Sequence, residues 1–584
     1  VDRSGAVAMG LSAINTYIGI DRNENTPEDF VSYVQNDQMG TVREDLVYDI
    51  ARHVDSSVHL FEKWGLPIWK DAEGNYQRAG RWQIMINGES YKRVVAEAAK
   101  LALGEDNILE RCFIVELVLD ANEENRIAGA VGFSVRENKV YIIKCNTMVV
   151  ACGGAVNIYQ PRSVGEGKGR AWYPVWNAGS TYTMAMKVGA ELTMMENRFT
   201  PARFKDGYGP VGAWFLLFKA KTLNGLGEGY VGSDAAKAEL QKYAPYGTAA
   251  ITPTCLRNHL MLFEMKEGRG PVMMDTVTAL AEMGGKLDKK EMKALESEAW
   301  ENFLDMTCGQ ANLWCGTNTE PDKKTSEIMP TEPYLLGSHS GCCGLWTSGP
   351  DYDWIPEEYK IRYKGKVYNR MTTVNGLFTA GDGVGASGHK FSSGSHAEGR
   401  ITAKAMARFA RDNADFKPTL NRSNEELVDL VYKPVRLFLE HKDYTTAIDI
   451  NPNYLKPEGM MYRLMKATHE YGAGTATFYQ TSSKNLEIIM DMFQMMHEDC
   501  EKLAAGDLHE LMRAWEIEHR IWTVESHLRH IQLRKETRYP GFYYQADFPG
   551  QDDENWFCFV NSKYDPKAKT WDIFKKDYIK IIPD

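Results

Sequence analysis

The stretch that decides the fold is residues 374–400, VNGLFTAGDGVGASGHKFSSGSHAEGR. The apolar run Leu377 to Ala380 is typical of a buried strand, and the Gly-Asp pair after it predicts a turn at the carboxyl end of that strand. Open α/β sheets bind ligands at this end, so we expect Asp382 to face a ligand. The serine-rich segment 392–395 then begins a helix that we expect to continue through Ala405.

This order of strand, Gly-Asp and Ser-Gly-Ser favours a flavin dinucleotide site. A carboxylate at position 382 suits hydrogen bonds from ribityl or ribose hydroxyls, and the N-terminal end of a helix favours an electron-rich ring in its anionic reduced form. The alternative is a glycine-rich turn with a serine cap and no ligand. The predicted cofactor contacts in this stretch are Gly381, Asp382, Ser392, Ser393, Gly394 and Ser395.

The composition is that of a large globular protein with an acidic balance. The 584 residues include 68 Lys and Arg against 79 Asp and Glu, and the net charge of −11 argues against nucleic acid as the main partner. No apolar run approaches the roughly 20 residues that span a bilayer, and Val1 to Ser4 show no start of a secretory signal. Ten cysteines without a Cys-x-x-Cys pair predict free thiols in a reducing cytoplasm, and no zinc site or iron–sulfur cluster in this chain.

Beyond the deciding stretch, the pattern changes twice along the chain. Residues 200–335 are irregular and rich in Gly, Pro and aromatic residues, with one charged helical piece from Lys286 to Phe303. From about residue 420 the pattern is helical, and apolar stripes at 486–496 and 508–522 predict packing between helices rather than a cofactor site. The last forty residues do not show the helical spacing of apolar residues, and their pattern predicts extended segments.

Residues 374–400 resemble the second FAD motif of the succinate dehydrogenase/fumarate reductase flavoprotein family. Other segments resemble that family in the same order: RSGAVA at 3–8, VVACGG at 149–154, SHSG at 338–341 and KETRYP at 535–540. The resemblance covers essentially the whole chain. It implies further cofactor contacts from Ser4, Gly5, Ala6, Ser12, Ala151, Cys152, Gly153 and Gly154.

The same resemblance implies an α/β, Rossmann-like FAD-binding domain that is discontinuous in sequence. An α+β capping domain is inserted between its two parts, and a helical domain with an extended tail follows. The implied limits are 1–198 and 333–420 for the two parts of the FAD-binding domain, 199–332 for the capping domain and 421–584 for the helical domain. Substrate would lie between the FAD-binding and capping domains.

Three departures separate the chain from the dicarboxylate enzymes of this family. Gly5 stands where those enzymes carry the histidine that bonds covalently to FAD, so we expect noncovalent FAD. ENRFTPARF at 196–204 replaces their His-Pro-Thr substrate segment. This segment, with 207–219 and 81–90, is closely similar to the alpha subunits of dissimilatory adenylylsulfate (APS) reductases. The family's N-terminal Gly-x-Gly-x-x-Gly turn is absent, and GEGKG at 165–169 lacks the preceding strand.

This resemblance implies reduction of APS to sulfite and AMP, or the reverse, through an adduct between flavin N5 and sulfite. Such chemistry requires fixed cations that face the anion. We predict Arg203 as the first anion-binding group, because guanidinium binds oxyanions in a bidentate way, and Arg257 as the second. The alternatives are ion pairs of Arg203 with Asp206 and of Arg257 with Glu264.

His339 is the predicted acid or charge-stabilising group beside the flavin, because histidine can titrate near neutral pH. His389 and His396 would flank the flavin helix and could simply cap or pack. The predicted substrate contacts are Asn15, Glu89, Trp172, Phe215, Leu216 and Arg257. Aromatic residues in such runs are more often core residues.

Electrons must come from outside the chain, so the resemblance implies a ferredoxin-like beta subunit with [4Fe-4S] clusters and, indirectly, a membrane electron donor. Two other functions remain open. A fumarate- or succinate-type oxidoreductase or an L-aspartate oxidase is disfavoured by the loss of His-Pro-Thr. A non-catalytic flavoprotein is disfavoured by an anion-binding Arg203 together with His339.

Overall fold

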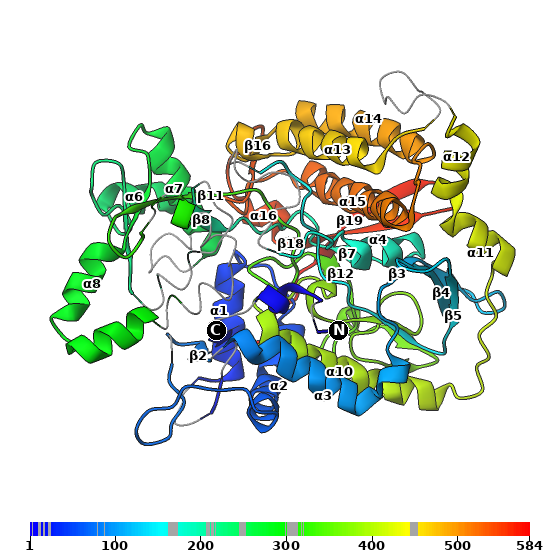
Figure 1. The fold of residues 1–584 in the computed structure, drawn as a ribbon, viewed down its shortest axis with the longest axis horizontal. Helices are drawn as coiled ribbons and strands as arrows, with labels where there is room; N and C mark the ends of the chain where they lie inside the picture. The colour runs from blue at the N-terminus through cyan, green and yellow to red at the C-terminus, as the bar shows by residue number, and fades with distance from the viewer. Residues whose placement is uncertain are drawn as a thin grey trace.

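A computed structural model gives the fold of the chain (Figure 1). The residues that it describes are 1–2, 4–9, 13–15, 18–20, 25–78, 80–86, 88–161, 173–205, 211, 215, 218–243, 253–297, 300, 314–316, 318, 320–443 and 454–583. Of the predicted site residues, Ser12, Trp172 and Leu216 lie outside this set, and so do the side chains of Asn15 and Glu89.

The deciding stretch forms a strand, a turn and a helix. β15 (Leu377–Thr379) pairs in parallel with β6 (Met148–Val150), so that the turns after both strands lie at one edge. Thr379 strengthens the pair, because its hydroxyl donates to the carbonyl of Val150 at 2.7 Å. The helix α10 (Phe391–Asp412) begins one residue earlier and ends seven residues later than the pattern predicts.

A second sheet lies beside this core. β3 (Cys112–Leu119), β4 (Ile127–Ser134) and β5 (Val140–Lys144) are antiparallel, with β4 in the middle and fully buried. The sequence predicts two buried strand pieces in 140–154, but the structure places them in different sheets and leaves β5 only half-buried.

Three N-terminal helices cover α10 and the start of the chain: α1 (Pro27–Asp37), α2 (Glu44–Lys63) and α3 (Tyr91–Leu103). Thr26 and Asp29 form a capping box at the start of α1, which satisfies backbone N–H groups that the helix itself leaves open. α2 packs along α10, and the short β1 (Ala13–Asn15) pairs with β2 (Gln83–Met85) nearby. The carboxyl end of α1 thereby approaches the turn after β15.

The segment predicted as a capping domain contains its own antiparallel sheet. Its strands are β8 (Ala202–Phe204), β11 (Ser326–Pro330), β10 (Met273–Asp275) and β9 (Lys221–Leu223), in that spatial order. The helices α6 (Asp234–Leu240), α7 (Thr254–Lys266) and α8 (Thr276–Gly284) lie with this sheet at one end of the molecule (Figure 1). The boundaries of the domains stay a prediction.

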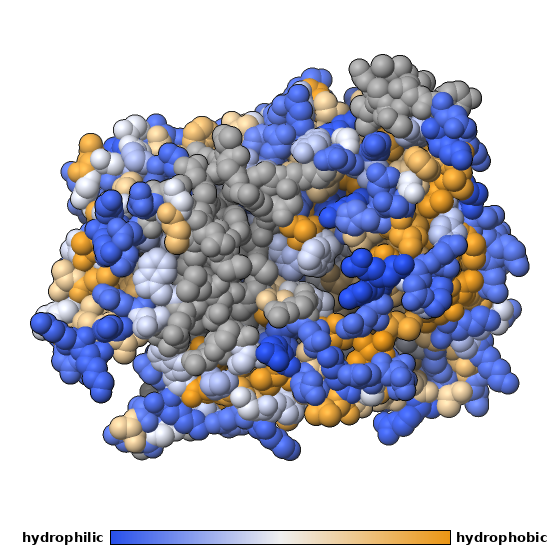
Figure 2. Space-filling model, in the orientation of Figure 1, coloured by the Kyte–Doolittle hydropathy of each residue, from blue (hydrophilic) through white to orange (hydrophobic). Residues whose placement is uncertain are grey.

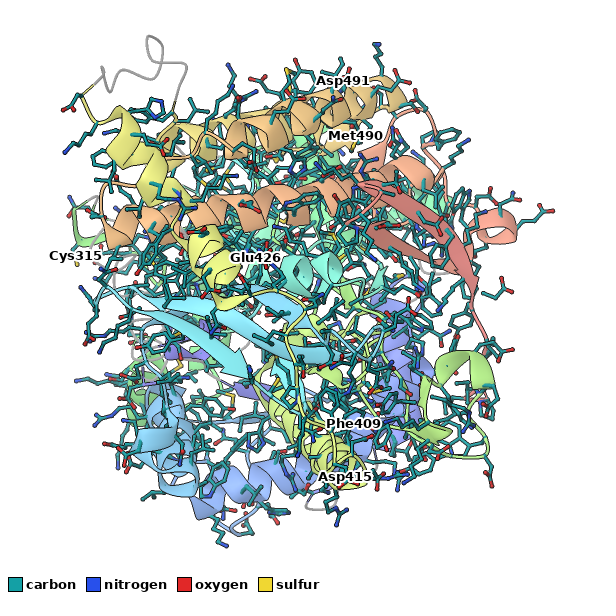
Figure 3. The ribbon with its side chains drawn as sticks, turned by 90° about the vertical axis from the view of Figure 1, so that its right-hand side faces the viewer. Cys315, Phe409, Asp415, Glu426, Met490 and Asp491 are labelled. Atoms are coloured by element: carbon teal, nitrogen blue, oxygen red, sulfur yellow. The ribbon has the colours of Figure 1, made fainter. Side chains whose placement is uncertain are left out.

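The C-terminal region is helical, as its apolar stripes predict. α11 (Asn424–Val431) and α12 (Lys433–His441) lead to α13 (Pro457–Tyr471), α14 (Ser483–Cys500) and α15 (Leu508–Leu533). The predicted α14 stripe is core, with Leu486, Ile489, Phe493 and Met496 buried. Figure 3 shows Met490 on α14 in the upper helical layer and Phe409 on α10 in the lower one, with β3 to β5 between.

The predicted extended tail is a long hairpin. β18 (Cys558–Asp565) and β19 (Thr570–Asp577) pair with each other, and β18 also pairs with β7 (Leu192–Thr193), whose other neighbour is β12 (Gly344–Leu345). Thr193 donates a hydrogen bond to Asn561 at 2.7 Å within this sheet. The end of the chain therefore completes a sheet that begins in its first third.

A chain of buried charges joins Glu196, just before the predicted capping domain, to the turn after α15. Arg534 bonds Glu196 at 2.8 Å and Glu536 at 2.7 Å, and Arg538 bonds Glu536 at 2.7 Å. All four side chains have an exposed fraction of 0%. Each charge is compensated by a neighbour of opposite sign, as burial requires.

We expect the protein to lose stability in acid through two histidines of α15. Burial lowers the pKa of His519 to about 4 and the pKa of His527 to about 3. In the unfolded chain both bind a proton below about pH 6.5, whereas the folded protein keeps them neutral to a much lower pH. The free energy of unfolding should therefore fall by about 1.4 kcal/mol per pH unit for each histidine as the pH drops below about 6.

Thermal unfolding midpoints at pH 8, 6 and 5 test this expectation. His519→Gln should reduce the steepness of the acid loss, and His509→Gln, which changes an exposed residue of the same helix, should leave it unaltered. Equal steepness in all three proteins would contradict the role of burial.

Hydrophilic side chains and smaller apolar patches alternate over the described part of the face in Figure 2. None of the described helices combines the length and apolar character that a membrane crossing requires. Nine cysteines lie in the described ranges, and none of these nine is in a disulfide, as predicted.

Candidate active site

A cavity of about 1600 Å³ lies where the β6–β15 edge, α10 and the capping segment meet. Single small ligands occupy pockets of roughly 300–1,000 Å³, so this cavity has room for a cofactor and a substrate together. The structure brings most of the predicted residues to its wall: Ser4, Gly5, Ala6, Ala151, Cys152, Gly153, Phe215, Arg257, His339, Gly381, Asp382, Ser392 and Ser395.

Asp382 lies at the carboxyl end of β15, as predicted. Its Oδ1 accepts hydrogen bonds from the backbone N–H of Ser338 at 2.8 Å and from the Ser338 hydroxyl at 2.6 Å. Burial raises the pKa of Asp382, although these bonds and one from the backbone of Gly154 act in the opposite direction. Gly154 therefore contacts the Asp382 carboxylate through its backbone N–H and does not itself line the cavity.

The first turn of α10 presents Ser392 and Ser395 to the cavity. Ser393 and Gly394 are buried on the other side of the turn and are not part of the wall. The backbone N–H groups of a helix's first turn have no partners within the helix, and they carry its positive dipole end. This end therefore suits an electron-rich ring.

Glycines keep the wall open where a cofactor would pass. Gly5 has a φ of +78°, and an added Cβ there would find no atom within 4 Å. The N–H of Cys152 donates to the Thr181 hydroxyl at 2.9 Å, which fixes the loop after β6. A flavin dinucleotide fits this wall, because a carboxylate, a helix N-terminus and small residues border one large cavity.

His339 lies among aromatic rings. Its ring stacks on Phe199 with a centroid distance of 4.1 Å and meets Phe391 edge-on at 4.5 Å. The N–H of Ser340 donates to His339 Nδ1 at 2.9 Å, so the ring proton is on Nε2. Burial, with the charge of His389, lowers the pKa of His339 to about 3. The sequence predicts titration near neutral pH, whereas this environment keeps the ring neutral.

The two arginine candidates have different surroundings. Arg203, on β8, has an exposed fraction of 0% and bonds Glu332 at 2.6 Å and Thr331 at 2.9 Å. Its side chain is not among those that line the cavity. Its sequence-based alternative partner, Asp206, lies outside the described residues. The role of Arg203 in anion binding stays a prediction.

Arg257, in the first turn of α7, is exposed and lines the cavity. Its Nη2 donates to the hydroxyl of Thr254 at 3.0 Å. The alternative partner suggested by sequence, Glu264, bonds Arg269 instead, at 2.8 Å. Of the two arginines, Arg257 is therefore the one whose side chain borders the cavity.

Several wall residues were not predicted: Tyr33, Tyr173, Trp176, Phe199, Asn258 and Ser338. Phe199 lies inside the segment that departs from the dicarboxylate pattern, and this departure is a signal that could have identified it. Tyr33 carries no such signal, because α1 approaches the cavity only in the folded chain.

No family model matches the chain. It is 60% identical over 604 aligned residues to "Adenylylsulfate reductase subunit alpha" of Megalodesulfovibrio gigas, an alignment that covers 100% of this chain and 90% of the relative. Adenylylsulfate reductase of Archaeoglobus fulgidus is similar in structure, with a TM-score of 0.95, 54% identity and coverage of 100% of this chain and 90% of that chain.

An adenosine-5-phosphosulfate reductase in complex with sulfite, described as a covalent adduct, has the same TM-score at 53% identity, with coverage of 100% of this chain and 90% of that one. Escherichia coli quinol fumarate reductase has a TM-score of 0.69 at 18% identity, covering 100% of this chain and 91% of that chain, and thus shares the fold. These likenesses confirm the predicted flavoprotein fold. The chain belongs to the alpha-subunit family of adenylylsulfate reductases, flavin-dependent oxidoreductases with the fold of fumarate reductase flavoproteins.

Proposed function

We propose that this chain, with FAD bound, reduces APS to sulfite and AMP or catalyses the reverse reaction. The observation that carries the proposal is the 60% identity, along the full chain, to a relative named as an adenylylsulfate reductase alpha subunit. The cavity supports it, because Arg257 and His339 line the same wall as the flavin-type turn and helix. The quinol fumarate reductase of Escherichia coli shares the fold with this chain at only 18% identity.

FAD would lie along Ser4 to Ala6, Ala151 to Gly153 and Gly381 to Asp382, with its ring at the start of α10. When bound, FAD supplies the two electrons and the position that reacts with sulfur. The chain's own residues bind and orient the anion and exclude water. Arg257 is a cation on the cavity wall, and Arg203, the first predicted anion-binding group, is buried on β8.

His339 holds its proton at Nε2 and, being neutral, acts as a hydrogen-bond donor rather than as a cation. Its stacking on Phe199 fixes the plane of the ring. Phe215 borders the cavity on the capping side, where an apolar surface suits adenine. The predicted substrate contacts of Asn15, Glu89, Trp172 and Leu216 remain part of the proposal.

The electrons require a partner. No group of three or more His, Cys, Asp or Glu side chains that could hold a metal ion occurs within the described ranges. The proposal assigns [4Fe-4S] clusters to a ferredoxin-like beta subunit, with a membrane donor behind it and a cytoplasmic location for the complex. The relative's designation as an alpha subunit supports a partner chain.

A visible-absorption titration of the FAD-loaded protein tests the reaction. Sulfite should bleach the flavin, and AMP with an electron acceptor should then yield APS. Bleaching alone is insufficient, because many flavins react with sulfite. If AMP has no effect and fumarate reoxidises the reduced flavin, the proposal is wrong and the dicarboxylate function is correct.

We expect noncovalent FAD, because Gly5 has no side chain that could bond to it. Acid precipitation should therefore release all the flavin into the supernatant, where its absorbance is measured. Flavin that stays with the precipitated protein after washing would contradict this expectation.

A further inference from the structure

Asp37 and His389 form a buried pair at the cavity. Asp37 is the last residue of α1, and His389 lies two residues before α10. His389 Nε2 bonds Asp37 Oδ2 at 2.5 Å, and the exposed fractions of the two side chains are 4% and 1%. Burial favours the neutral acid, but the charge and hydrogen bond of His389 outweigh it and lower the pKa of Asp37. Asp37 is therefore a carboxylate.

The pair is linked to the cation already described. Asp37 Oδ1 accepts a hydrogen bond from the N–H of Thr254 at 2.9 Å. The hydroxyl of Thr254 in turn accepts from Arg257 at 3.0 Å. The backbone N–H of His389 also donates to the carbonyl of His339 at 2.8 Å. One carboxylate thus connects α1, the start of α7 and the loop that carries His339.

The second ring nitrogen of His389 has no hydrogen-bond partner among the described residues. Nε2 is engaged with Asp37, while Nδ1 is buried without such a partner, although the residue lines the cavity. A buried polar atom of this kind normally bonds protein or water, so an orphan at a cavity wall indicates a ligand contact. The backbone at His389 is in the left-handed region, with a φ of +53°.

We propose that His389 contacts the substrate directly, its protonated Nδ1 donating a hydrogen bond to an anionic oxygen of APS or its products, with Asp37 as the positioning residue. The inference rests on the proposed function. It gives the two histidines of the cavity different tasks: His339 is a neutral donor, and His389 carries positive charge stabilised by Asp37.

The surroundings of His389 fit a charged ring. Asp37 and Tyr33 of α1 contact the His389 ring directly, and so does Phe391 at the start of α10. Arg257 of α7 lies close enough to Asp37 to interact with its charge, and His339 lies close enough to interact with the charge of His389. Asp37 is the anion of this set and is in direct contact. A substrate anion beside Nδ1 would be compensated by the ring of His389 and by Arg257, since the charge of Asp37 is already paired with Nε2.

His389→Asn is the sharpest test, because asparagine tolerates the left-handed backbone at this position but cannot carry the charge. The affinities of AMP and sulfite are measured by calorimetry, and kcat/KM for APS is measured between pH 6 and 9. We expect the variant to lose about tenfold or more in its affinity for AMP or sulfite or in kcat/KM for APS, as loss of a charge-assisted hydrogen bond requires.

Asp37→Asn provides a second readout that a purely structural role would not give. Asparagine keeps a hydrogen-bonding partner for His389 Nε2, so the affinity should fall less than in Asp37→Ala, which removes that partner. His509→Gln on α15 is the matched control and should equal wild type. Flavin content and the unfolding midpoint confirm that each variant is folded.

The outcomes separate the two proposals. If wild type converts APS while His389→Asn keeps the wild-type affinities for AMP and sulfite and the wild-type kcat/KM for APS, the inference about His389 is overturned and the proposed function stands. If wild type shows no reaction with APS and no affinity for AMP, the proposed function itself fails.

Discussion

Arg257→Gln should lower kcat/KM for APS by about a hundredfold, the usual cost of removing one fixed donor from a developing anion. The guanidinium borders the cavity from the first turn of α7 and is held there by Thr254. Glutamine keeps some polarity and length but removes the charge. Steady-state kinetics of APS reduction at saturating electron donor measure the effect.

Two further variants make the result interpretable. Lys266→Gln removes an equal charge from the last turn of the same helix, away from the cavity wall, and should behave as wild type. Arg257→Lys keeps the charge but loses the planar fork, so its activity should lie between wild type and Arg257→Gln. An equal loss from Arg257→Gln and Lys266→Gln would show that the effect is not local to the site.

Arg534→Met should be the most destabilising single change considered. It removes the shared partner of Glu196 and Glu536 and also two bonds to the carbonyls of Trp556 and Cys558. Breaking a buried ion pair from one side leaves a buried charge uncompensated and costs about 3–5 kcal/mol. The thermal unfolding midpoint, measured at one protein concentration and one scan rate, should fall accordingly.

The exposed pair of Arg362 and Glu357 supplies the control. These side chains are 44% and 62% exposed and lie 2.8 Å apart. Solvent-exposed pairs contribute about 1 kcal/mol or less, so Arg362→Met should change the midpoint little. Similar midpoints for the two variants would mean that the buried chain of charges is not needed for stability.

Local patterns predicted the strand, turn and helix around Asp382 well. Leu377 to Ala380, Asp382 and the serines after Phe391 form one continuous segment, so their positions follow from neighbours in sequence. The pairing of β15 with β6 was harder to predict, because it joins strands more than 200 residues apart. The hairpin at 558–577 was predicted only as extended chain, since its partner β7 lies elsewhere in the sequence.

The substrate side depended on distant contacts. Arg203 pairs with Glu332, 129 residues away, a partner that sequence did not suggest, whereas the suggested partner Asp206 lies outside the described residues. Sequence gave His389 a capping or packing role, because Asp37 lies 352 residues before it. The neutral state of His339 could not be predicted from sequence either, because it results from burial among aromatic rings that come together only in the folded chain.

The sheet shared by β7 and β18 has a consequence for biosynthesis. Thr193 and Asn561 are 368 residues apart, and at about 5–20 residues per second a ribosome needs roughly 20–70 s to make the intervening chain. During that time the nascent protein carries an unpaired strand edge at residues 192–193, a place where newly made chains associate wrongly. Chaperones that hold this edge, or slow synthesis, should therefore raise the yield of native protein, whereas release of chains shortened before residue 558 should favour aggregation.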